Sequence, residues 1–150
     1  MKKRILWIED DYYAIRGLMR PLERAGFQVD AATSAIAGYQ LAIHWQVYDL
    51  IVVDLILPLR DDDRTLPGVV NGWSREEHVG VGLLKWLLGD MKVTCPVLLL
   101  SVVRHPVHTY QLGGMGLASY LPKRGLLPSQ VKAEVFRLLE SAPGDSTRAE

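Results

Sequence analysis

The fold is decided by residues 51–58, which read IVVDLILP. An apolar, β-branched run that ends on an acid and is soon followed by a proline is typical of a strand buried on both faces of a parallel sheet. Open α/β sheets bind ligands at the carboxyl ends of their strands, so Asp54 would lie where such a sheet does its chemistry. A single acid can also simply mark the exit of a strand into solvent. The meaning of Asp54 therefore depends on what ends the other strands.

The composition describes a single globular domain. A chain of 150 residues can bury a sizeable core but is too short for two domains of ordinary size. Its 49% hydrophobic and 23% charged residues are typical of a globular protein rather than a disordered one. The 17 basic and 17 acidic residues cancel, so no net charge favours direct binding to nucleic acid or to an anionic membrane.

Nothing in the pattern favours export or membrane insertion. The basic start, residues 1–4, resembles that of a signal peptide, but the apolar run that follows spans only residues 5–8. No uncharged apolar run reaches the roughly 18 residues that a membrane-spanning helix needs. The single cysteine, Cys95, forms no internal disulfide, which suits a reducing compartment. We expect a cytoplasmic protein without membrane insertion.

Apolar strands alternate with helical patterns along the chain. We expect strands at residues 5–8, 27–31, 51–54, 97–100 and 118–121. We expect helices at residues 12–25, where Pro21 should kink the helix, then from a cap at Thr33 or Ser34 to about residue 44, at 83–88, at 106–112 and from 128 onward. Residues 59–80 read as a long irregular loop with a short helix near Ser74, and residues 141–150 as a polar tail or linker stub. This order predicts an α/β domain over residues 1–140 with right-handed crossovers.

Polar residues terminate four of these strands. Glu9 and Asp10 follow the first, Asp54 ends the third, Ser101 ends the fourth and Lys123 follows the fifth. Each has an ordinary structural explanation when taken alone: a helix cap, a strand-end hydroxyl or a solvated lysine. Parallel strands bring all of these ends to one edge of the sheet, so we expect the side chains to converge there.

This set, in this order, resembles the receiver domain of two-component response regulators, the CheY-like family. Leu57-Pro58 after the acid and Tyr120, three residues before Lys123, belong to the same pattern. The resemblance covers about residues 3 to 140. It implies a doubly wound, five-stranded parallel sheet of order 2-1-3-4-5, the flavodoxin-like receiver fold.

The resemblance also implies a chemistry. Asp54 would be the phosphoacceptor and would form an acyl phosphate. Mg²⁺ would be the cofactor, held by Glu9, Asp10, Asp54 and the backbone carbonyl of Ile56, because clustered carboxylates repel one another and magnesium prefers oxygen ligands. Lys123 would pair with the phosphoryl oxygens. The domain would catalyse its own phosphorylation and dephosphorylation, without being a turnover enzyme acting on a metabolite.

The resemblance further implies a surface switch and protein partners. Ser101 would donate to the phosphoryl group, and its movement would draw Tyr120 inward. The partners would be a histidine kinase or phosphotransfer protein and a downstream protein target. A homodimer would use the face formed by residues 106–112, strand 118–121 and the last helix.

The chain departs from the family pattern at several positions. Asp54 and Ser101 lie 47 positions apart, so the 59–80 loop reads as an insertion, either a lid or docking loop with Trp73 as a contact or a solvated excursion. Val102 is bulkier than the family's usual residue and would narrow access to the site, and Arg124 follows Lys123 where the family has proline. Ile56 and Val103 offer no side chain to orient an attacking water, which predicts a long-lived phosphoryl group.

Two other functions stay open on the sequence alone. The first is a phosphorylation-independent protein-interaction module on a receiver fold, with the insertion as its binding element. The second is an aspartyl phosphatase, although Ile56 stands where such enzymes place a second acid. Three further motifs are weak: Gly80-Val81-Gly82 as a dinucleotide loop, His105 with His108 as metal ligands, and the Asp61-Asp62-Asp63 triplet as a calcium site.

Overall fold

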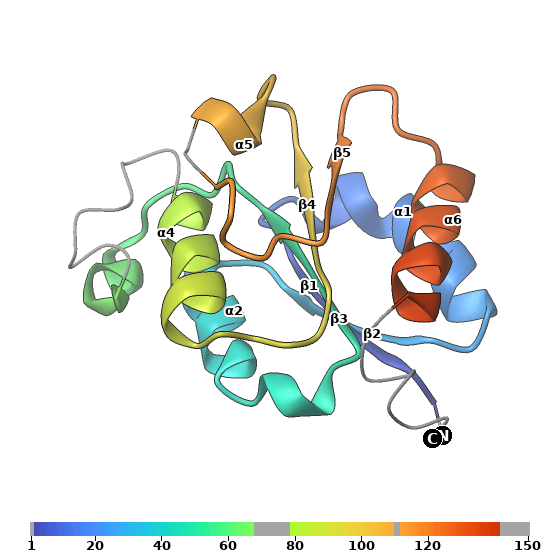
Figure 1. The fold of residues 1–150 in the computed structure, drawn as a ribbon, viewed down its shortest axis with the longest axis horizontal. Coiled ribbons are helices and arrows are strands. Elements are labelled where there is room, and N and C mark those ends of the chain that lie inside the picture. Colours follow the sequence, from blue (N-terminus) through green and yellow to red (C-terminus); the bar gives the residue numbers. More distant parts are fainter. Residues whose placement is uncertain (1, 68–78, 110–111, 142–150) are drawn as a thin grey trace.

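The computed structural model describes residues 2–67, 79–109 and 112–141. Five parallel strands form one sheet in the order β2-β1-β3-β4-β5, as the resemblance predicted (Figure 1). The strands are β1 (Arg4–Ile8), β2 (Gln28–Ala32), β3 (Leu50–Asp54), β4 (Val97–Ser101) and β5 (Ser119–Pro122). Their bounds lie within one residue of those expected from the sequence.

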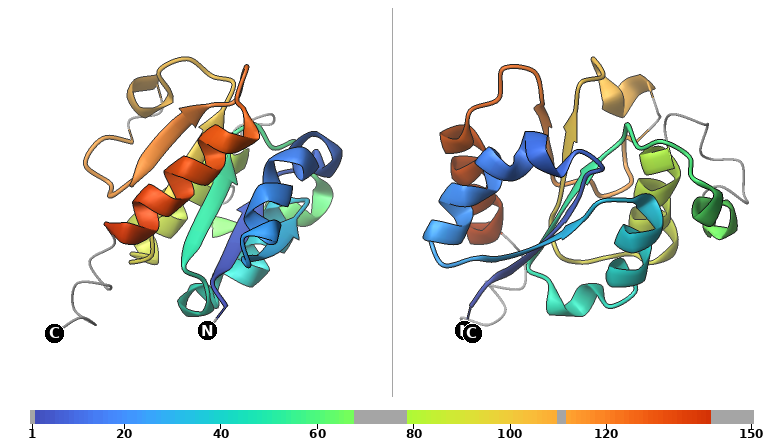
Figure 2. Two further views of the ribbon diagram at one scale, coloured as in Figure 1. Left: turned by 90° about the vertical axis from the view of Figure 1, so that its right-hand side faces the viewer. Right: turned by 180° about the vertical axis from the view of Figure 1, so that it is seen from behind.

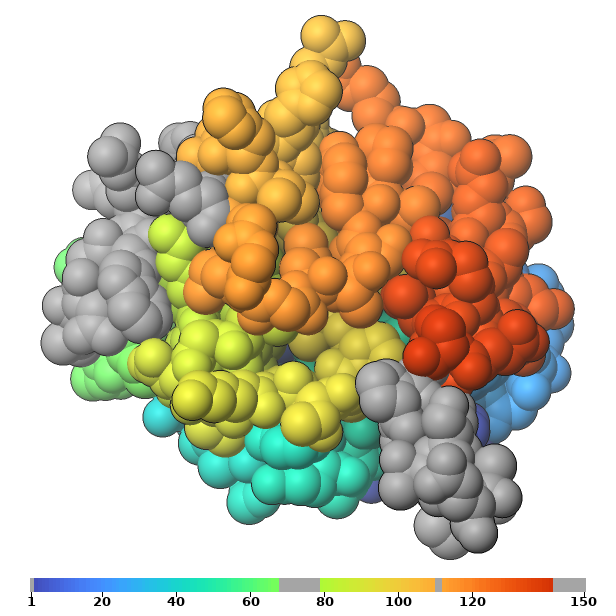
Figure 3. Space-filling view, in the orientation of Figure 1, coloured from blue at the N-terminus to red at the C-terminus, as the bar shows by residue number. Residues whose placement is uncertain are grey.

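Helices cover both faces of this sheet, as Figure 2 shows. One face carries α1 (Tyr12–Arg24) and α6 (Pro128–Glu140), which contact each other. The other carries α2 (Ala35–Ala42) and α4 (Val79–Lys85), which continues as a π-helical turn at Trp86–Asp90. The short α5 (Pro106–Thr109) and β5 lie between α4 and α6 in the space-filling view (Figure 3). Among the described residues, no helix is long and apolar enough to cross a membrane.

The apolar strands read as continuous runs because both faces of the sheet are buried. Alternate residues of one strand belong to different cores: Ile51 and Val53 pack on the α2 and α4 side, whereas Val52 packs on the α1 and α6 side. All three are fully buried, and each contributes about 1.5–3 kcal/mol relative to an exposed side chain. Two helical layers thus fix the strand whose last residue is Asp54.

Local signals set the helix ends. The Asp11 carboxylate accepts a hydrogen bond from the Ala14 amide at 3.1 Å and caps α1. The helix runs through Pro21 to Arg24, and Gly26, with a φ of +99°, follows its end. Ser34 caps α2 by accepting from the Ala37 amide at 3.2 Å. Of the helix predicted at residues 106–112, the structure describes α5 at Pro106–Thr109; residues 110–111 lie outside the described residues, and Leu112 is not helical.

The predicted irregular loop is partly folded onto the domain. Its start forms a 3-10 turn at Asp61–Thr65, and Leu66 is buried in the core beside α2 and α4. The loop was predicted to end at about residue 80, and α4 is described from Val79. Val79 is buried against the sheet and so already belongs to the apolar helix. Trp73 and the helix predicted near Ser74 lie outside the described residues.

Candidate functional site

The carboxyl ends of β1, β3 and β5 meet at the upper edge of the sheet in Figure 1. Since the strands are parallel and pair in register, Ile8 lies beside Val53 and the residues that follow each strand share one edge. A cavity of about 450 Å³ opens there. Its lining consists of Glu9, Asp10, Asp11, Asp54, Ile56, Pro58, Val102 and Lys123.

Three carboxylates form the floor of this cavity. Oxygen atoms of Glu9, Asp10 and Asp54 all lie within 4.8 Å of one another. Glu9 and Asp54 are only 1% and 4% exposed, so little water reaches their charges. Burial, and then the charge of Asp10, raises the pKa of Asp54 to about 6, against the hydrogen bond that its Oδ1 accepts from the Ile56 amide at 3.1 Å.

Lys123 partly compensates this negative charge. Its Nζ contacts Glu9 Oε1 and lies 3.2 Å from Asp54 Oδ2, with the lysine side chain 20% exposed. Burial lowers the pKa of this ammonium group. One cation thus faces three carboxylates, which leaves the site net negative.

The site fits a divalent cation. Glu9 Oε2 is buried and has no hydrogen-bond partner in the described part of the chain. A buried carboxylate oxygen without a donor is costly unless a cation meets it. Mg²⁺ binds carboxylate and carbonyl oxygens and keeps several waters, which the open cavity would admit. Within the described ranges, Glu9, Asp10 and Asp54 are the one group of three acidic, histidine or cysteine side chains close enough to share an ion.

Ser101 and Tyr120 lie behind the cavity rather than in its lining. The Ser101 side chain is fully buried, and its Oγ accepts a hydrogen bond from the Val103 amide at 3.0 Å. The Tyr120 hydroxyl donates to the Val103 carbonyl at 3.3 Å. Val103 therefore connects the two residues, while the neighbouring Val102 is 49% exposed at the cavity mouth.

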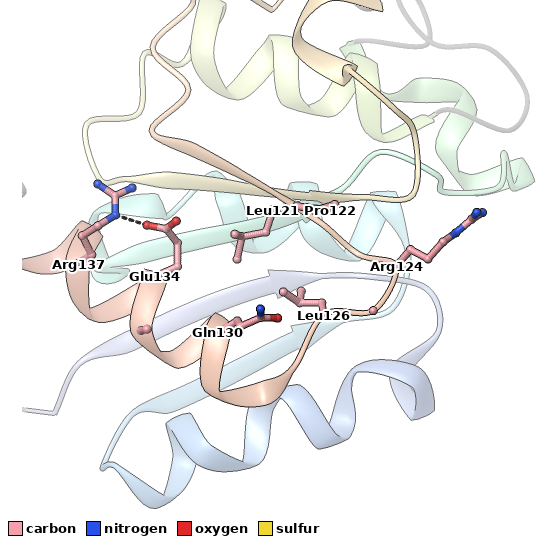
Figure 4. A pocket seen from close by; sticks show the side chains of 9 residues that line it. Leu121, Pro122, Arg124, Leu126, Gln130, Glu134 and Arg137 are labelled. Atoms are coloured by element: carbon pink, nitrogen blue, oxygen red, sulfur yellow. Dashed lines mark hydrogen bonds and ion pairs between the residues drawn. The ribbon is translucent and has the colours of Figure 1, made fainter.

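A second cavity of similar size shows that volume alone does not identify the site. It has about 470 Å³ and lies between β5 and α6 (Figure 4). Leu121 and Leu126 supply its apolar part, and its charged pair, Arg137 with Glu134, is already matched. Arg124, which follows Lys123, also lines this cavity and not the acidic one.

Sequence reasoning missed the role of two residues. Asp63 is fully buried, and its two oxygens accept hydrogen bonds from the amides of Ile36 (3.1 Å) and Arg60 (2.8 Å), so it anchors the loop on α2 and does not face a calcium site. Gly80 packs against the backbone at the end of β3. The signal in the sequence was a glycine within an apolar helical pattern, which indicates a close approach of two backbones.

No protein-family model matches the chain. The probable transcriptional regulatory protein SilR of Salmonella typhimurium is 32% identical over 120 residues, which are 80% of this chain and 44% of that protein. The transcriptional regulatory protein CusR of Escherichia coli (strain K12) is 30% identical over the same lengths. The chain thus spans less than half the length of these relatives.

Several solved structures with the same fold are described as receiver domains or response regulators. A CheY-like response regulator receiver domain protein from Methanospirillum hungatei JF-1 superposes with a TM-score of 0.72 at 18% identity, covering 97% of this chain and 99% of that one. A two-component response regulator from Clostridium difficile gives 0.69 at 22% identity, covering 95% and 99%. At these identities the likeness concerns the fold.

Proposed function

We infer that the chain is a receiver domain like those of two-component response regulators, and from that premise we propose that it accepts a phosphoryl group on Asp54. The observation that carries the proposal is the cavity in which Asp54 is buried with two further carboxylates and one ammonium group. Phosphoryl transfer asks the protein for an in-line nucleophile and for positive charge around the transferred group. In this cavity Asp54 would be the nucleophile. The excess of negative charge would attract a cation, which would add to the positive charge of Lys123 around the transferred group.

The transfer begins from the ionised Asp54 carboxylate. Its Oδ1 is held by the Ile56 amide, so Oδ2, on the side of Lys123, is the oxygen placed to attack. A bond forms between this oxygen and phosphorus while the bond from phosphorus to the donor's imidazole nitrogen breaks, and the leaving imidazole takes up a proton. The product is an aspartyl phosphate.

Glu9, Asp10, Asp54 and the backbone carbonyl of Ile56 are the proposed ligands of Mg²⁺, which when bound supplies charge neutralisation for the transferred oxygens. Lys123 adds a flexible point charge 3.2 Å from Asp54 Oδ2.

Ser101 and Tyr120 are the proposed switch. In this structure the Ser101 oxygen accepts from Val103, so its proton remains available for a phosphoryl oxygen. A movement of Ser101 toward the phosphoryl group would pull the Val103 backbone, to which the Tyr120 hydroxyl donates. The surface around β5 would then change with phosphorylation.

The remaining proposals concern the context of the domain. A histidine kinase or phosphotransfer protein in the cytoplasm would supply the phosphoryl group, and a downstream protein, or a second copy bound through α5, β5 and α6, would read the output. The folded unit would be residues 1–140, with 59–80 as an insertion. Apolar side chains at Ile56 and Val103 would make the phosphoryl group long-lived, because neither orients an attacking water.

The test is mass spectrometry of the intact protein after incubation with acetyl phosphate and Mg²⁺. We expect one phosphoryl group on the wild type, none on Asp54→Asn, and loss of labelling with a chelator. Asp61→Asn is the matched control, because that acid is exposed outside the cavity. A wild type that stays unlabelled by this donor and by a phosphorylated kinase would instead support a phosphorylation-independent interaction module.

A further inference from the structure

The first turn of α4 touches the backbone of the phosphoacceptor strand. A Cβ atom built on Gly80 would lie 2.2 Å from the Asp54 carbonyl oxygen, 2.7 Å from Leu55 Cα and 2.8 Å from the Leu55 carbonyl oxygen. All three atoms belong to the main chain, so no side chain can rotate to make room. Any residue larger than glycine must displace either α4 or the end of β3.

The loop after β3 is bonded to the same helix turn. The Val79 amide donates to the Leu57 carbonyl at 3.1 Å, and the Leu57 amide donates to the Leu55 carbonyl at 3.1 Å. Leu55 and Leu57 are fully buried, so this segment has no freedom on its core side. Residues 54–57, which include Asp54 and the Ile56 carbonyl, are therefore held between the sheet and α4.

We propose that Gly80 is a positioning residue for Asp54: its missing side chain lets α4 seat against the end of β3 and fix the acceptor carboxylate and the Ile56 carbonyl in place. The inference rests on the proposed function, because it assigns Gly80 a part in building the metal and acceptor site. Gly80 touches neither the substrate nor the cation and acts only through the backbone of Asp54 and Leu55.

This arrangement also gives the 59–80 insertion a mechanical connection to the site. Its start is anchored on α2 through Asp63, and its end reaches α4 at Gly80, directly behind Asp54. The geometry of the acceptor loop thus depends on how α4 is seated, which is the property that the experiment below measures.

The test compares Gly80→Ala with Gly38→Ala. Gly38, in α2, is also a close contact, but with a side chain: its Cβ would lie 2.8 Å from two atoms of the Ile8 side chain. This variant therefore also strains a helix against the sheet but meets no backbone of β3. Both should lower the melting temperature. Only Gly80→Ala should weaken Mg²⁺ binding, measured by titration calorimetry at a temperature where both variants are folded by circular dichroism.

We expect the Mg²⁺ dissociation constant of Gly80→Ala to rise at least about tenfold, and its labelling rate by acetyl phosphate to fall about a hundredfold, as a displacement near 1 Å can cause. Gly38→Ala should stay within about twofold of the wild type in both, since the acceptor loop is untouched. A folded Gly80→Ala that binds Mg²⁺ and accepts phosphate like Gly38→Ala would overturn the inference and leave the proposed function intact. A wild type that does neither would overturn both.

If Gly80→Ala does not fold, the inference is tested on the wild-type protein instead. In amide resonance spectra, Mg²⁺ should shift the signals of Val79 and Gly80, because their turn is bonded to the ligand-bearing loop. The amide of Gly89, farther along the same helical segment, should not move. Val79 and Gly80 signals that stay unchanged at saturating Mg²⁺ would also overturn the inference.

Discussion

Two clusters of charged residues lie in this small domain, and they differ in whether their oxygens are satisfied. One, at the carboxyl edge of the sheet, contains Glu9, Asp54 and Lys123. The other, near the start of β1, contains Arg4 and Asp30. Both hold an acid and a base in contact, so a list of ion pairs would treat them alike.

In the Arg4 cluster the carboxylate is fully satisfied, although the Arg4 Nε is buried without a partner among the described residues. Asp30 accepts hydrogen bonds at 2.8 Å from both Arg4 and the Tyr48 hydroxyl, and at 3.2 Å from Gln28. Burial would raise the pKa of Asp30, but these hydrogen bonds, from Tyr48 first, outweigh it and the pKa is lowered. The hydrogen bonds therefore stabilise the ionised form of the Asp30 carboxylate.

In the edge cluster, by contrast, the carboxylate oxygens are not all satisfied. Burial raises the pKa of Asp54 to about 6, and one oxygen of Glu9 has no partner among the described residues. A fold that only needed stability would not leave such a group unpaired. The first cluster is an ion pair between two strands, and the second is an acidic cluster that could bind a cation. The pKa of Asp30 is lowered and that of Asp54 is raised, in line with this difference.

The largest effect should come from removing the cation of each cluster. Lys123→Met leaves Glu9 and Asp54 buried without a positive partner, so we expect the free energy of unfolding in urea to fall by about 4 kcal/mol without metal. Arg4→Met removes a partly exposed, screened partner and should lower the free energy of unfolding much less than Lys123→Met does. Saturating Mg²⁺ should restore part of the loss in Lys123→Met only. Equal losses of unfolding free energy in both variants would contradict the proposed difference between the two clusters.

A second test uses the opposite signs of the two pKa shifts. The folded state holds the Asp54 proton more tightly than the unfolded chain, whose pKa is near 3.8. The free energy of unfolding should therefore fall by about 3 kcal/mol as the pH rises from about 4 to about 6. Urea unfolding across this range measures it, and Asp54→Asn should remove the decline.

Asp30 and Mg²⁺ provide the controls for this pH test. The lowered pKa of Asp30 gives stability that is present above its unfolded pKa and lost as the pH falls. Asp30→Asn should therefore be less stable at neutral pH and lack this loss in acid, while the decline between pH 4 and 6 stays. Mg²⁺ binds ionised carboxylates of the native state, so saturating Mg²⁺ should reverse the slope between pH 4 and 6. A slope that Mg²⁺ does not change would place the titrating group elsewhere.

The strands and the acidic site could be predicted from the sequence because both depend on local patterns. Branched apolar runs buried on two faces mark the strands, and Asp54, Glu9 and Lys123 stand at strand ends that any parallel sheet brings to one edge. The fold order came from the resemblance rather than from the pattern. The structure has the strand order that the resemblance implied.

The contacts made between distant segments could not be predicted. Nothing near Asp63 in the sequence indicates that its oxygens accept from the amide of Ile36, because the partner is a backbone group 27 positions away. Gly80 gave a signal, a glycine in a helical pattern, but what it approaches depends on how α4 crosses β3. The periodicity of apolar residues predicts which face of a helix is buried, but not where on the sheet that helix packs.

Asp63 sharpens the comparison, because it is a buried acid without a cation whose two oxygens are both satisfied. Asp63→Asn replaces one acceptor oxygen by an NH₂ group, which would face a backbone amide that is also a donor. We therefore expect the free energy of unfolding to fall by about 2 kcal/mol. The Mg²⁺ dissociation constant should not change. A change in Mg²⁺ affinity would mean that burial of an acid, rather than an unsatisfied oxygen, marks the cation site.

The smallest effect should come from Tyr48→Phe. The variant deletes the hydroxyl that donates to Asp30 but keeps the ring beside Arg4, so the free energy of unfolding should fall by about 1 kcal/mol. Burial and the neighbouring Asp30 raise the pKa of Tyr48 to about 12, so the wild type holds stability below pH 10 that is lost as the pH rises toward 12, and the variant should lack this alkaline loss. The pKa of Asp30 should move up toward its ordinary value, which carboxylate resonances can follow.

Mg²⁺ binding at the edge cluster should stay at the wild-type value, because the two clusters share no residue. Any coupling between Tyr48 and Mg²⁺ affinity would show that they form one network.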